Sequence, residues 1–260
     1  MRPLLLLVND DGYAAPGMKA LMETLRPLGD LLVFAPDGNR SGKAHSMTSD
    51  VPLFARLIEQ EEGCTVYACN GMPVDCVKLA LARFVPRRPS LVASGINRGS
   101  NASVCALYSG TVGAAMEAAQ GGLAAVAFSL ATEERQADFS PTLPLVRSIA
   151  EETLLHGLPP QVMLNVNFPD TGRIRGARVC RSAAASWSDE AMERKDPFGR
   201  TYYWLNGQFH CDDWATDADQ WCLQHGYASI TPCRPDYTDR DALSLMRERY
   251  ETRASEGTKA

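Results

Sequence analysis

The amino-acid sequence predicts an α/β protein, a Rossmann-like doubly wound and mostly parallel sheet in three α/β/α layers, with a C-terminal β-hairpin arm and a terminal helix. Two observations support this prediction. Short apolar runs, typical of strands buried on both faces, alternate with helical patterns as far as Pro160. Polar clusters follow several of these runs, as expected where parallel strands end at a ligand-binding edge.

The predicted elements follow one another along the chain. Leu4 to Val8 is an apolar run that indicates the first buried strand, and the helical pattern after it ends at Gly29. The alternation then continues with "LLVFAPD" (strand), "VKLALARF" (helix), "SLVASGIN" (strand), "SGTVGAAMEAAQGG" (helix), "LAAVAFSL" (strand) and "PTLPLVRSIAEETLLHGLP" (helix).

The pattern changes in the last 100 residues or so. "VMLNVNFPD" and "ARVCRS" indicate strands, whereas Trp187 to Cys222 is aromatic and polar without clean periodicity, which we interpret as a hairpin arm. The chain then returns with a short strand, "YASITPC", an amphipathic helix, "DRDALSLMRERY", and a polar tail expected to fray. We therefore divide the chain into a core (1–180), an arm (181–226) and a returning strand and helix (227–260).

Composition narrows the classes of partner. The 260 residues carry a formal net charge of −5 with a pI near 5.4, so no overall attraction to a nucleic-acid polymer is expected. No apolar run is long enough to span a bilayer, and the first residues lack the pattern of a secretory signal. The eight cysteines form no C-x-x-C pair and are expected to be reduced thiols. Together these features predict a cytoplasmic protein without a membrane partner.

Two adjacent carboxylates, Asp10 and Asp11, follow the first predicted strand. Side by side in a buried setting they would repel each other unless a cation neutralised them, and a hard divalent ion prefers such oxygen ligands. Ser41 and Asn97 follow two other predicted strands and are the natural candidates to complete the ligand set. Alone, "NDDG" is equally typical of a turn. The oxygen donors at the neighbouring strand ends favour the metal site.

A helix start rich in small residues supplies a candidate anion site. Ser109, Gly110 and Thr111 open this helix, whose free N–H groups and dipole favour a phosphate, although plain helix capping also uses such residues. We assign all three to phosphate binding. Asn101 is a further candidate, to contact either the phosphate or its loop, and Asn9 is expected to orient a ligand or to hold the loop.

Several motifs, in order, resemble those of the SurE (survival protein E) family. They are "VNDDGYAAPGMKAL", "APDGNRSG", "PVDCVKLAL", "SGINRGSN", "YSGTVGAAMEA", "LNVNFPD", "DPFGRTYYWL" and "GYASITP", and they cover nearly the whole chain. The resemblance implies a metal-dependent nucleotidase that hydrolyses nucleoside 5'- and 3'-monophosphates, with a side activity on short polyphosphate. It implies one Mg²⁺ or Mn²⁺ per subunit, and the family's ligands fall on Asp10, Asp11, Ser41 and Asn97.

The chain also departs from the family pattern. Where family members carry an acidic pair before "YSGT", this chain has Ser103, Val104 and Cys105, and alanines replace the expected basic and aromatic residues at 183–185. Gly38 and Met72 stand where an arginine and a threonine are usual. None of these changes removes a proposed metal ligand. They bear instead on substrate preference.

The mechanism expected from these residues is attack on the phosphorus by a metal-activated water, with Asp10, Asn9 and Asn97 as the catalytic group. A covalent aspartyl nucleophile is the alternative, but nucleophile-type phosphatases usually separate their two acids by one residue. His45 is a candidate acid for the leaving group in either mechanism, although a lone histidine in a polar loop usually has no chemical role.

Two other functional classes share features with this sequence. A non-catalytic nucleotide-binding module would keep the phosphate loop, and it remains the alternative function. An NAD-linked oxidoreductase needs G-x-G-x-x-G after the first strand, which "NDDGYAAPG" lacks.

The aromatic arm predicts an assembly. Eight aromatic residues between Trp187 and Trp221 must be buried somewhere, and in the family this region resembles a hairpin that reaches a neighbouring subunit. We expect a homodimer or homotetramer in which the arm packs between subunits.

Overall fold

The apolar run near the start of the chain forms β1 (Leu4–Val8), and all five of its residues are buried. In the computed structural model, which describes residues 2–256, β1 lies between two parallel neighbours, β2 (Asp30–Pro36) and β5 (Leu91–Arg98). Because helices cover both faces of this central strand, its sequence is continuously apolar and does not alternate.

The sheet has nine strands in the order β3-β4-β2-β1-β5-β6-β7-β13-β8. Its centre is parallel from β4 to β7, whereas β3 pairs antiparallel with β4 and β13 pairs antiparallel with β7. The outer strands are β3 (Ala55–Glu61), β4 (Cys64–Cys69), β6 (Ala125–Ala131), β7 (Met163–Pro169), β8 (Ala177–Val179) and β13 (Ala228–Cys233). The predicted mostly parallel sheet is therefore confirmed.

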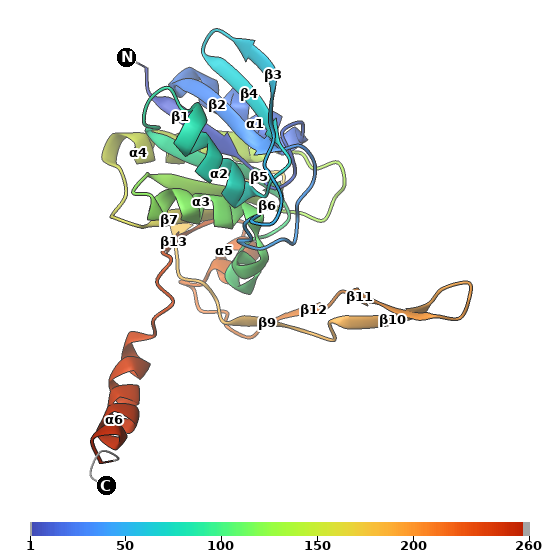
Figure 1. Ribbon diagram of the computed structural model, residues 1–260, viewed down its shortest axis with the longest axis vertical. Coiled ribbons are helices and arrows are strands. Elements are labelled where there is room, and N and C mark those ends of the chain that lie inside the picture. The colour runs from blue at the N-terminus through green and yellow to red at the C-terminus, as the bar shows by residue number, and fades with distance from the viewer. Residues whose placement is uncertain (1, 257–260) are drawn as a thin grey trace.

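Helices cover both faces of the sheet, which gives the three layers seen in Figure 1. One apolar core joins α1 and α4 to one face of β1, and a second joins α2 and α3 to the other. Side chains of β1 alternate between the two cores, as the pleat of a strand requires. The four covering helices are α1 (Pro16–Leu25), α2 (Pro73–Leu79), α3 (Gly110–Gln120) and α4 (Leu143–His156).

Shorter helical pieces complete the body. A further helix, α5 (Asp219–Gln224), packs against β13 and β7. A π-helical turn (Ala80–Phe84) extends α2. The 3-10 turns are Arg26–Leu28, Ser103–Tyr108 and Ser140–Thr142.

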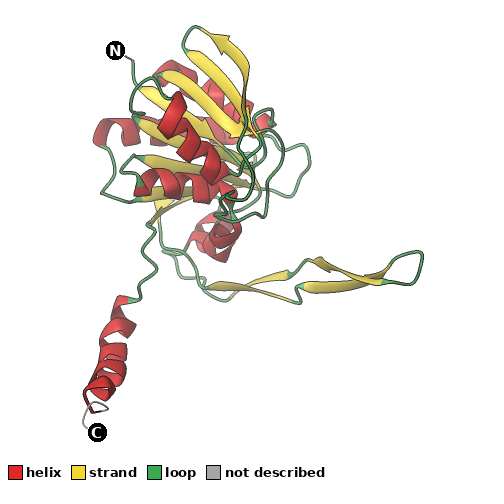
Figure 2. Cartoon of the chain, viewed as in Figure 1, coloured by secondary structure: helices red, strands yellow, loops and turns green. Residues whose placement is uncertain are grey.

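Two segments project from this body (Figures 1 and 2). The arm is a long antiparallel ribbon in which β9 (Ala185–Ser188) pairs with β12 (Gln208–Cys211), and β10 (Ala191–Lys195) pairs with β11 (Thr201–Leu205). Every residue of β10 and β11 is exposed. The terminal helix α6 (Arg240–Glu256) also extends away from the sheet.

The structure adds elements that the sequence reasoning did not identify. The sequence pattern indicates no strand between residues 42 and 72, where β3 and β4 form a hairpin around Gly63. It also gives no sign of α5. Both elements are short, and β3 is mostly exposed, so neither has a strong apolar period. The predicted arm and terminal helix are present. The boundaries at 180 and 226 stay a prediction, and residues 257–260 of the expected tail lie outside the described part.

The cysteines and the helices bear on two expectations from composition. All eight cysteines are free thiols. None of the helices within residues 2–256 has the length and apolar character needed to cross a membrane.

Candidate active site

The two adjacent acids lie in a sharp loop that begins where β1 ends. The Asn9 side chain brackets this loop, since its Nδ2 donates to the Gly12 carbonyl at 2.9 Å and its Oδ1 accepts the Gly12 N–H at 3.1 Å. Gly12 has a φ of +104°, a conformation that side chains disfavour. The strand therefore stops before the acids, so that Asp10 and Asp11 are not forced onto opposite faces of the sheet. Asn9 holds the loop.

Backbone hydrogen bonds bring three strand ends to these acids. The Arg40 N–H, after β2, donates to the Asp10 carbonyl at 2.7 Å. The Arg98 N–H, at the end of β5, donates to Asp11 Oδ2 at 3.4 Å. Ser41 and Asn97 are the neighbours of these two donors in the chain, so all four predicted ligands lie at one edge of the sheet.

The orientation of two side chains matters for what this edge can bind. The Ser41 side chain lies close enough to the Asp11 carboxylate to oppose the rise in its pKa. The Asn97 Nδ2 group donates a hydrogen bond to the Gly99 carbonyl at 2.9 Å. The other atom of this amide, Oδ1, is therefore the one that can serve as a metal ligand. An amide oxygen, a hydroxyl and two carboxylates are the donors that Mg²⁺ and Mn²⁺ prefer.

The environment of both carboxylates disfavours their ionised form and so raises their pKa values. Burial raises the pKa of Asp10, which is 3% exposed, against the opposing hydrogen bond from Thr111. Burial also raises the pKa of Asp11, and the neighbouring charge of Asp10 raises it further. A bound dication would remove both penalties, so this donor set fits a metal ion. This donor set has only two acids. No group of three His, Cys, Asp or Glu side chains that could hold a metal occurs among the described residues.

The start of α3 lies against Asp10. Thr111 is fully buried, and its hydroxyl donates to Asp10 Oδ1 at 2.7 Å. A Cβ added at Gly110 would lie 2.9 Å from the Asp10 Cβ, so only glycine allows this approach. Ser109 accepts the Val112 N–H at 3.1 Å and therefore caps the helix. In this geometry Thr111 holds Asp10, while Ser109 and Gly110 place the helix N-terminus beside it.

Asn101 anchors the loop between β5 and α3. Its N–H donates to Asn167 Oδ1 at 2.8 Å, its Nδ2 donates to Ser129 Oγ at 2.7 Å, and its carbonyl accepts from Asn165 Nδ2 at 2.9 Å. This geometry favours the loop-holding role over direct phosphate contact. The sequence reasoning missed the three partners, whose only signal was polar residues within buried strands, two asparagines in "LNVNF" and one serine in "LAAVAFSL".

Two other polar residues close to the site, Arg40 and His45, have structural partners. Arg40 forms an ion pair with Asp37 at 2.7 Å, on the rim of the site. His45 Nε2 lies 3.2 Å from the Ala106 carbonyl, and its ring packs against Gly113 of α3. His45 therefore secures the loop that carries Ser41 against the helix.

A pocket of about 940 Å³ opens directly from Asp11. The start of α1 and the loop after β6 form its walls, with Phe139 as an apolar surface. Arg98 and Arg135 bring positive charge to it, and neither guanidinium is hydrogen-bonded or ion-paired to another side chain within the described residues. The pocket can therefore receive an anionic or polar group attached to a phosphate held at the edge.

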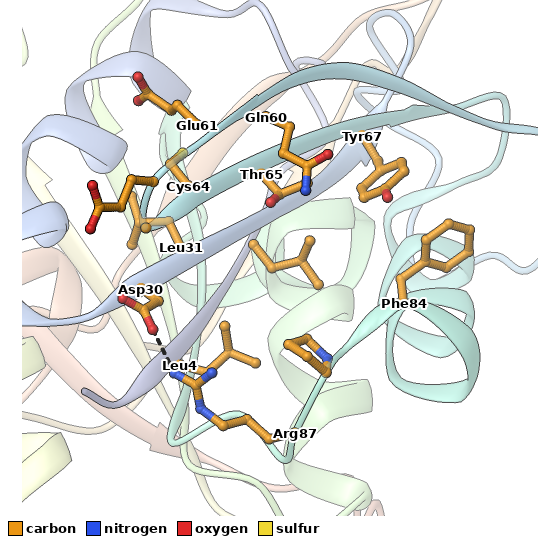
Figure 3. A pocket seen from close by; sticks show the side chains of 14 residues that line it. Leu4, Asp30, Leu31, Gln60, Glu61, Cys64, Thr65, Tyr67, Phe84 and Arg87 are labelled. Atoms are coloured by element: carbon orange, nitrogen blue, oxygen red, sulfur yellow. Dashed lines mark hydrogen bonds and ion pairs between the residues drawn. The ribbon is translucent and has the colours of Figure 1, made fainter. Parts of the chain in front are cut away.

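A second cavity lies at the opposite edge of the sheet (Figure 3). It is lined by the first residues of β1 and β2 and by the β3–β4 turn. Arg87 crosses it to pair with Asp30 at 2.7 Å. It is separate from the four candidate metal ligands.

Comparison with known proteins identifies the family. The model of the family "Survival protein SurE" matches residues 5–189. The chain belongs to the SurE family. It is 46% identical over 248 residues to the 5'-nucleotidase SurE of Phocaeicola vulgatus, covering 95% of each chain. It is 44% identical to that of Flavobacterium johnsoniae, covering 94% of this chain and 96% of the relative.

A solved SurE structure has the same fold. The crystal structure of the SurE protein from Aquifex aeolicus superposes with a TM-score of 0.81 at 35% identity, covering 95% of this chain and 99% of that one. Within this SurE-family fold, the unusual stretch Ser103–Cys105 begins the 3-10 turn that leads into α3.

Proposed function

We propose that this protein is a metal-dependent 5'-nucleotidase that hydrolyses nucleoside monophosphates to nucleoside and phosphate. The observation that carries the proposal is the meeting of Asp10, Asp11 and the strand ends of Ser41 and Asn97 beside the N-terminus of α3. The relatives from Phocaeicola vulgatus and Flavobacterium johnsoniae, both named 5'-nucleotidase SurE, support it.

The four oxygen-bearing side chains Asp10, Asp11, Ser41 and Asn97 would hold one Mg²⁺ or Mn²⁺. When bound, such an ion neutralises phosphoryl charge and lowers the pKa of a coordinated water. The other residues of the site position these ligands. Thr111 fixes the orientation of the Asp10 carboxylate, and Asn9 fixes the loop that carries both acids.

The phosphate is bound at the start of α3 in this proposal. Backbone N–H groups near Ser109, Gly110 and Thr111 and the positive end of the helix dipole stabilise its negative charge. Asn101 contributes by holding the preceding loop. Asp10 is also placed to accept the proton of the attacking water, because its carboxylate borders this anion site.

The rest of the substrate occupies the pocket beside Asp11. A base can pack on Phe139 and hydrogen-bond to Gln136, and Arg98 and Arg135 can pair with a further anionic group. The two arginines favour a side activity on short polyphosphate, and the resemblance to the SurE family extends the proposal to 3'-monophosphates. No nucleic-acid polymer or membrane partner is proposed.

We also infer a homodimer or homotetramer built through the arm, because its tip residues are exposed apolar surface. Free thiols throughout support a reducing, cytoplasmic location.

Release of inorganic phosphate from AMP tests the proposal. We expect turnover with Mn²⁺ or Mg²⁺ and none after exhaustive dialysis against EDTA. The same assay with 3'-AMP and tripolyphosphate measures the side activities, and Arg98→Ala with Arg135→Ala should raise the KM for tripolyphosphate more than for AMP. Binding of AMP without phosphate release in the presence of metal would instead indicate a non-catalytic nucleotide-binding module.

A further inference from the structure

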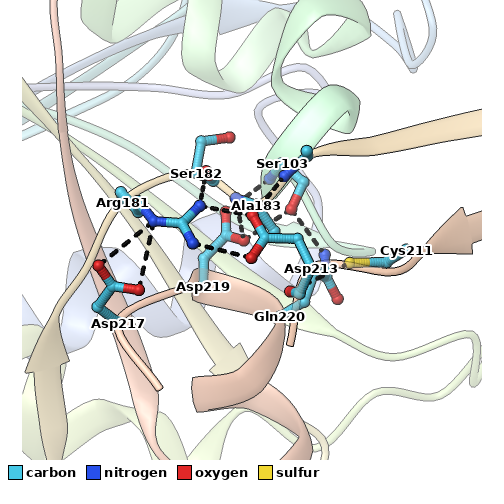
Figure 4. A network of polar contacts seen from close by, with 10 residues as sticks. Ser103, Arg181, Ser182, Ala183, Cys211, Asp213, Asp217, Asp219 and Gln220 are labelled. Carbon is cyan, nitrogen blue, oxygen red and sulfur yellow. Dashed lines mark hydrogen bonds and ion pairs between the residues drawn. The ribbon is translucent and has the colours of Figure 1, made fainter. Parts of the chain in front are cut away.

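A buried carboxylate, Asp219 at the start of α5, connects the base of the arm to the loop that precedes α3. Asp219 is 1% exposed and accepts three hydrogen bonds. Its Oδ2 accepts the Ser103 N–H at 2.7 Å, its Oδ1 accepts the Ser103 hydroxyl at 2.6 Å, and Oδ1 also accepts the Ala183 N–H at 3.0 Å. Figure 4 shows these three segments meeting at the one carboxylate.

The backbone of Ser103 is held in an uncommon conformation by this contact. Its φ is +55°, in the left-handed region that residues with a side chain seldom occupy. Both of its donors go to Asp219, and its hydroxyl oxygen accepts from Gln220 Nε2 at 3.1 Å. Residues in such conformations persist where the surrounding structure fixes them, and here α5 supplies that support.

The two chain segments at the base of the arm are joined to each other. Arg181 pairs with Asp213 through two hydrogen bonds, of 2.5 and 2.8 Å, and Asp213 also accepts the Ala184 N–H at 3.0 Å. On the other side, β9 packs against the 3-10 turn of the loop, where Trp187 lies close to Cys105. The arm base therefore contacts the loop at two places, through Asp219 and through Trp187.

The loop leads directly to the anion site. The 3-10 turn Ser103–Tyr108 ends at Ser109, the N-cap of α3, and the Tyr108 carbonyl accepts the Ala44 N–H at 3.1 Å from the loop that carries Ser41. Asn101 fixes the other end of this segment to the sheet. A displacement of Ser103 would be carried over six residues to the start of α3, because Asn101 prevents the segment from absorbing it upstream.

We propose that Asp219 and Ser103 are positioning residues for the hydrolytic reaction, and that they connect the geometry of the anion site to the base of the arm. This inference rests on the proposed nucleotidase function. Neither residue touches the candidate metal ligands. They act through Ser109 and the α3 N-terminus, so that an arm held by a second copy of the chain stabilises the catalytic arrangement.

The test uses the full-length variants Asp219→Asn, Ser103→Ala and the double variant. Asn keeps one acceptor oxygen and has an NH2 donor in place of the other, so one of the two backbone N–H groups, at Ser103 or at Ala183, loses its acceptor. Ser103→Ala keeps the Asp219 bond to Ala183. We expect kcat on AMP to fall on the order of tenfold in each single variant, within the range that misplaced catalytic groups cost. The kcat of the double variant should fall little further than that of Asp219→Asn, because both changes weaken the same contact between residues 103 and 219.

Separate readouts distinguish positioning from loss of fold. Calorimetry should give a Mn²⁺ affinity within about twofold of the wild type, since residues without a contact to the ligand set act independently of it. Hydrogen exchange of the amides in residues 103–115 should become faster, whether or not AMP is the substrate. The matched control is Asp217→Asn, an exposed partner of Arg181 at the same arm base, which should leave kcat and exchange unchanged.

Unchanged kcat and unchanged exchange in Asp219→Asn would overturn the inference, as would a kcat loss in strict proportion to lost Mn²⁺ sites. If Asp219→Asn does not fold, Ser103→Ala decides by the same criteria. A wild-type protein that releases no phosphate from AMP contradicts the proposed function, and the exchange result still reports whether Asp219 holds the α3 start.

Discussion

The carboxyl edge of the sheet and the arm depart in opposite ways from the usual pattern, in which polar side chains are exposed and apolar side chains are buried. At the sheet edge Asn9, Asp10 and Thr111 are polar yet at most 3% exposed. On the arm Trp204 and Leu205 are apolar yet 63% and 88% exposed. Buried polar groups and exposed large apolar groups are the informative exceptions in a folded protein.

The two exceptions have different physical consequences. Each buried polar side chain at the edge has hydrogen bonds within the chain. The free-energy cost that these bonds leave is that of burying two adjacent negative charges. That cost is removed by a cation. The exposed aromatic side chains of the arm have no such cost in charge, and what removes their contact with water is another apolar surface. The edge therefore requires a small cation to neutralise its charge, whereas the arm requires a protein partner to cover its apolar side chains.

The largest effect is expected from removing charge at the edge. Asp10→Asn and Asp11→Asn should each lower Mn²⁺ affinity by more than about 100-fold, since changes outside a ligand set already cost roughly 10- to 100-fold. Turnover of AMP should fall with it, while the metal-free protein keeps its fold because a buried charge has been removed. Calorimetry with Mn²⁺ measures the first effect. Asp138→Asn, a carboxylate of the neighbouring pocket, is the control, and equal affinity in all three variants would show that the ligand assignment is wrong.

The next effect concerns the arm. Replacing residues 191–205 with Gly-Gly removes β10 and β11 but keeps the base, because the Glu190 carbonyl already accepts the Asn206 N–H at 2.9 Å. We expect the mass from light scattering to drop to that of one shortened chain, slightly below the 28.3 kDa of the full chain, with turnover reduced less than in Asp10→Asn. Lys195→Ala, on the same ribbon, should leave the mass unchanged. An unaltered oligomer after the replacement would exclude the arm as the assembly element.

A smaller effect should follow at Thr111. Thr111→Val keeps the shape of the side chain but removes the hydrogen bond to Asp10, so Mn²⁺ affinity should fall roughly tenfold, the lower end of the range for groups that orient a metal ligand. Thr153→Val removes a hydroxyl that is equally buried and bonded to a helix carbonyl far from the site, and it should leave the affinity unchanged. Equal affinities in the two variants would remove Thr111 from the orienting role.

The smallest effect is a pH dependence in the metal-free protein. The pKa of Asp10 is raised in the folded state above its ordinary value of 3.8, so its stabilising contribution is present below that value and is lost as pH rises through the folded pKa. Wild type in EDTA should therefore lose stability relative to Asp10→Asn over that rise, by a few degrees in Tm. Thermal melts from pH 4 to 8 measure the difference. Saturating Mn²⁺ should stabilise only the wild type, by about 2.7 kcal/mol at 100 times Kd.

Much of the body could be predicted from local patterns. β1 begins and ends where the apolar run does, and the predicted strands around Ala93 and Val126 are β5 and β6 of the sheet. The sequence also predicted that Asp10, Asp11, Ser41 and Asn97 lie at one edge, because parallel strands place their carboxyl ends together. The assignment of these residues to a metal stays a prediction.

The short edge hairpin and the roles of particular polar residues could not be predicted in the same way. β3 carries charged and polar residues on both faces, so its strand state depends on pairing with β4. Thr111 was expected to bind phosphate, and only the packing of α3 against the β1 loop turned its hydroxyl to Asp10.

The sequence by itself determined the order of the central strands and of the helices that cover them, the position of the polar edge and the existence of an aromatic arm. It did so because apolar period and turn chemistry act between residues close in the chain. Only the tertiary structure decided that Ser103 and Asp219, 116 residues apart, share two hydrogen bonds. Contacts of that kind depend on how whole elements pack, and no local pattern encodes which distant donor a buried carboxylate will receive.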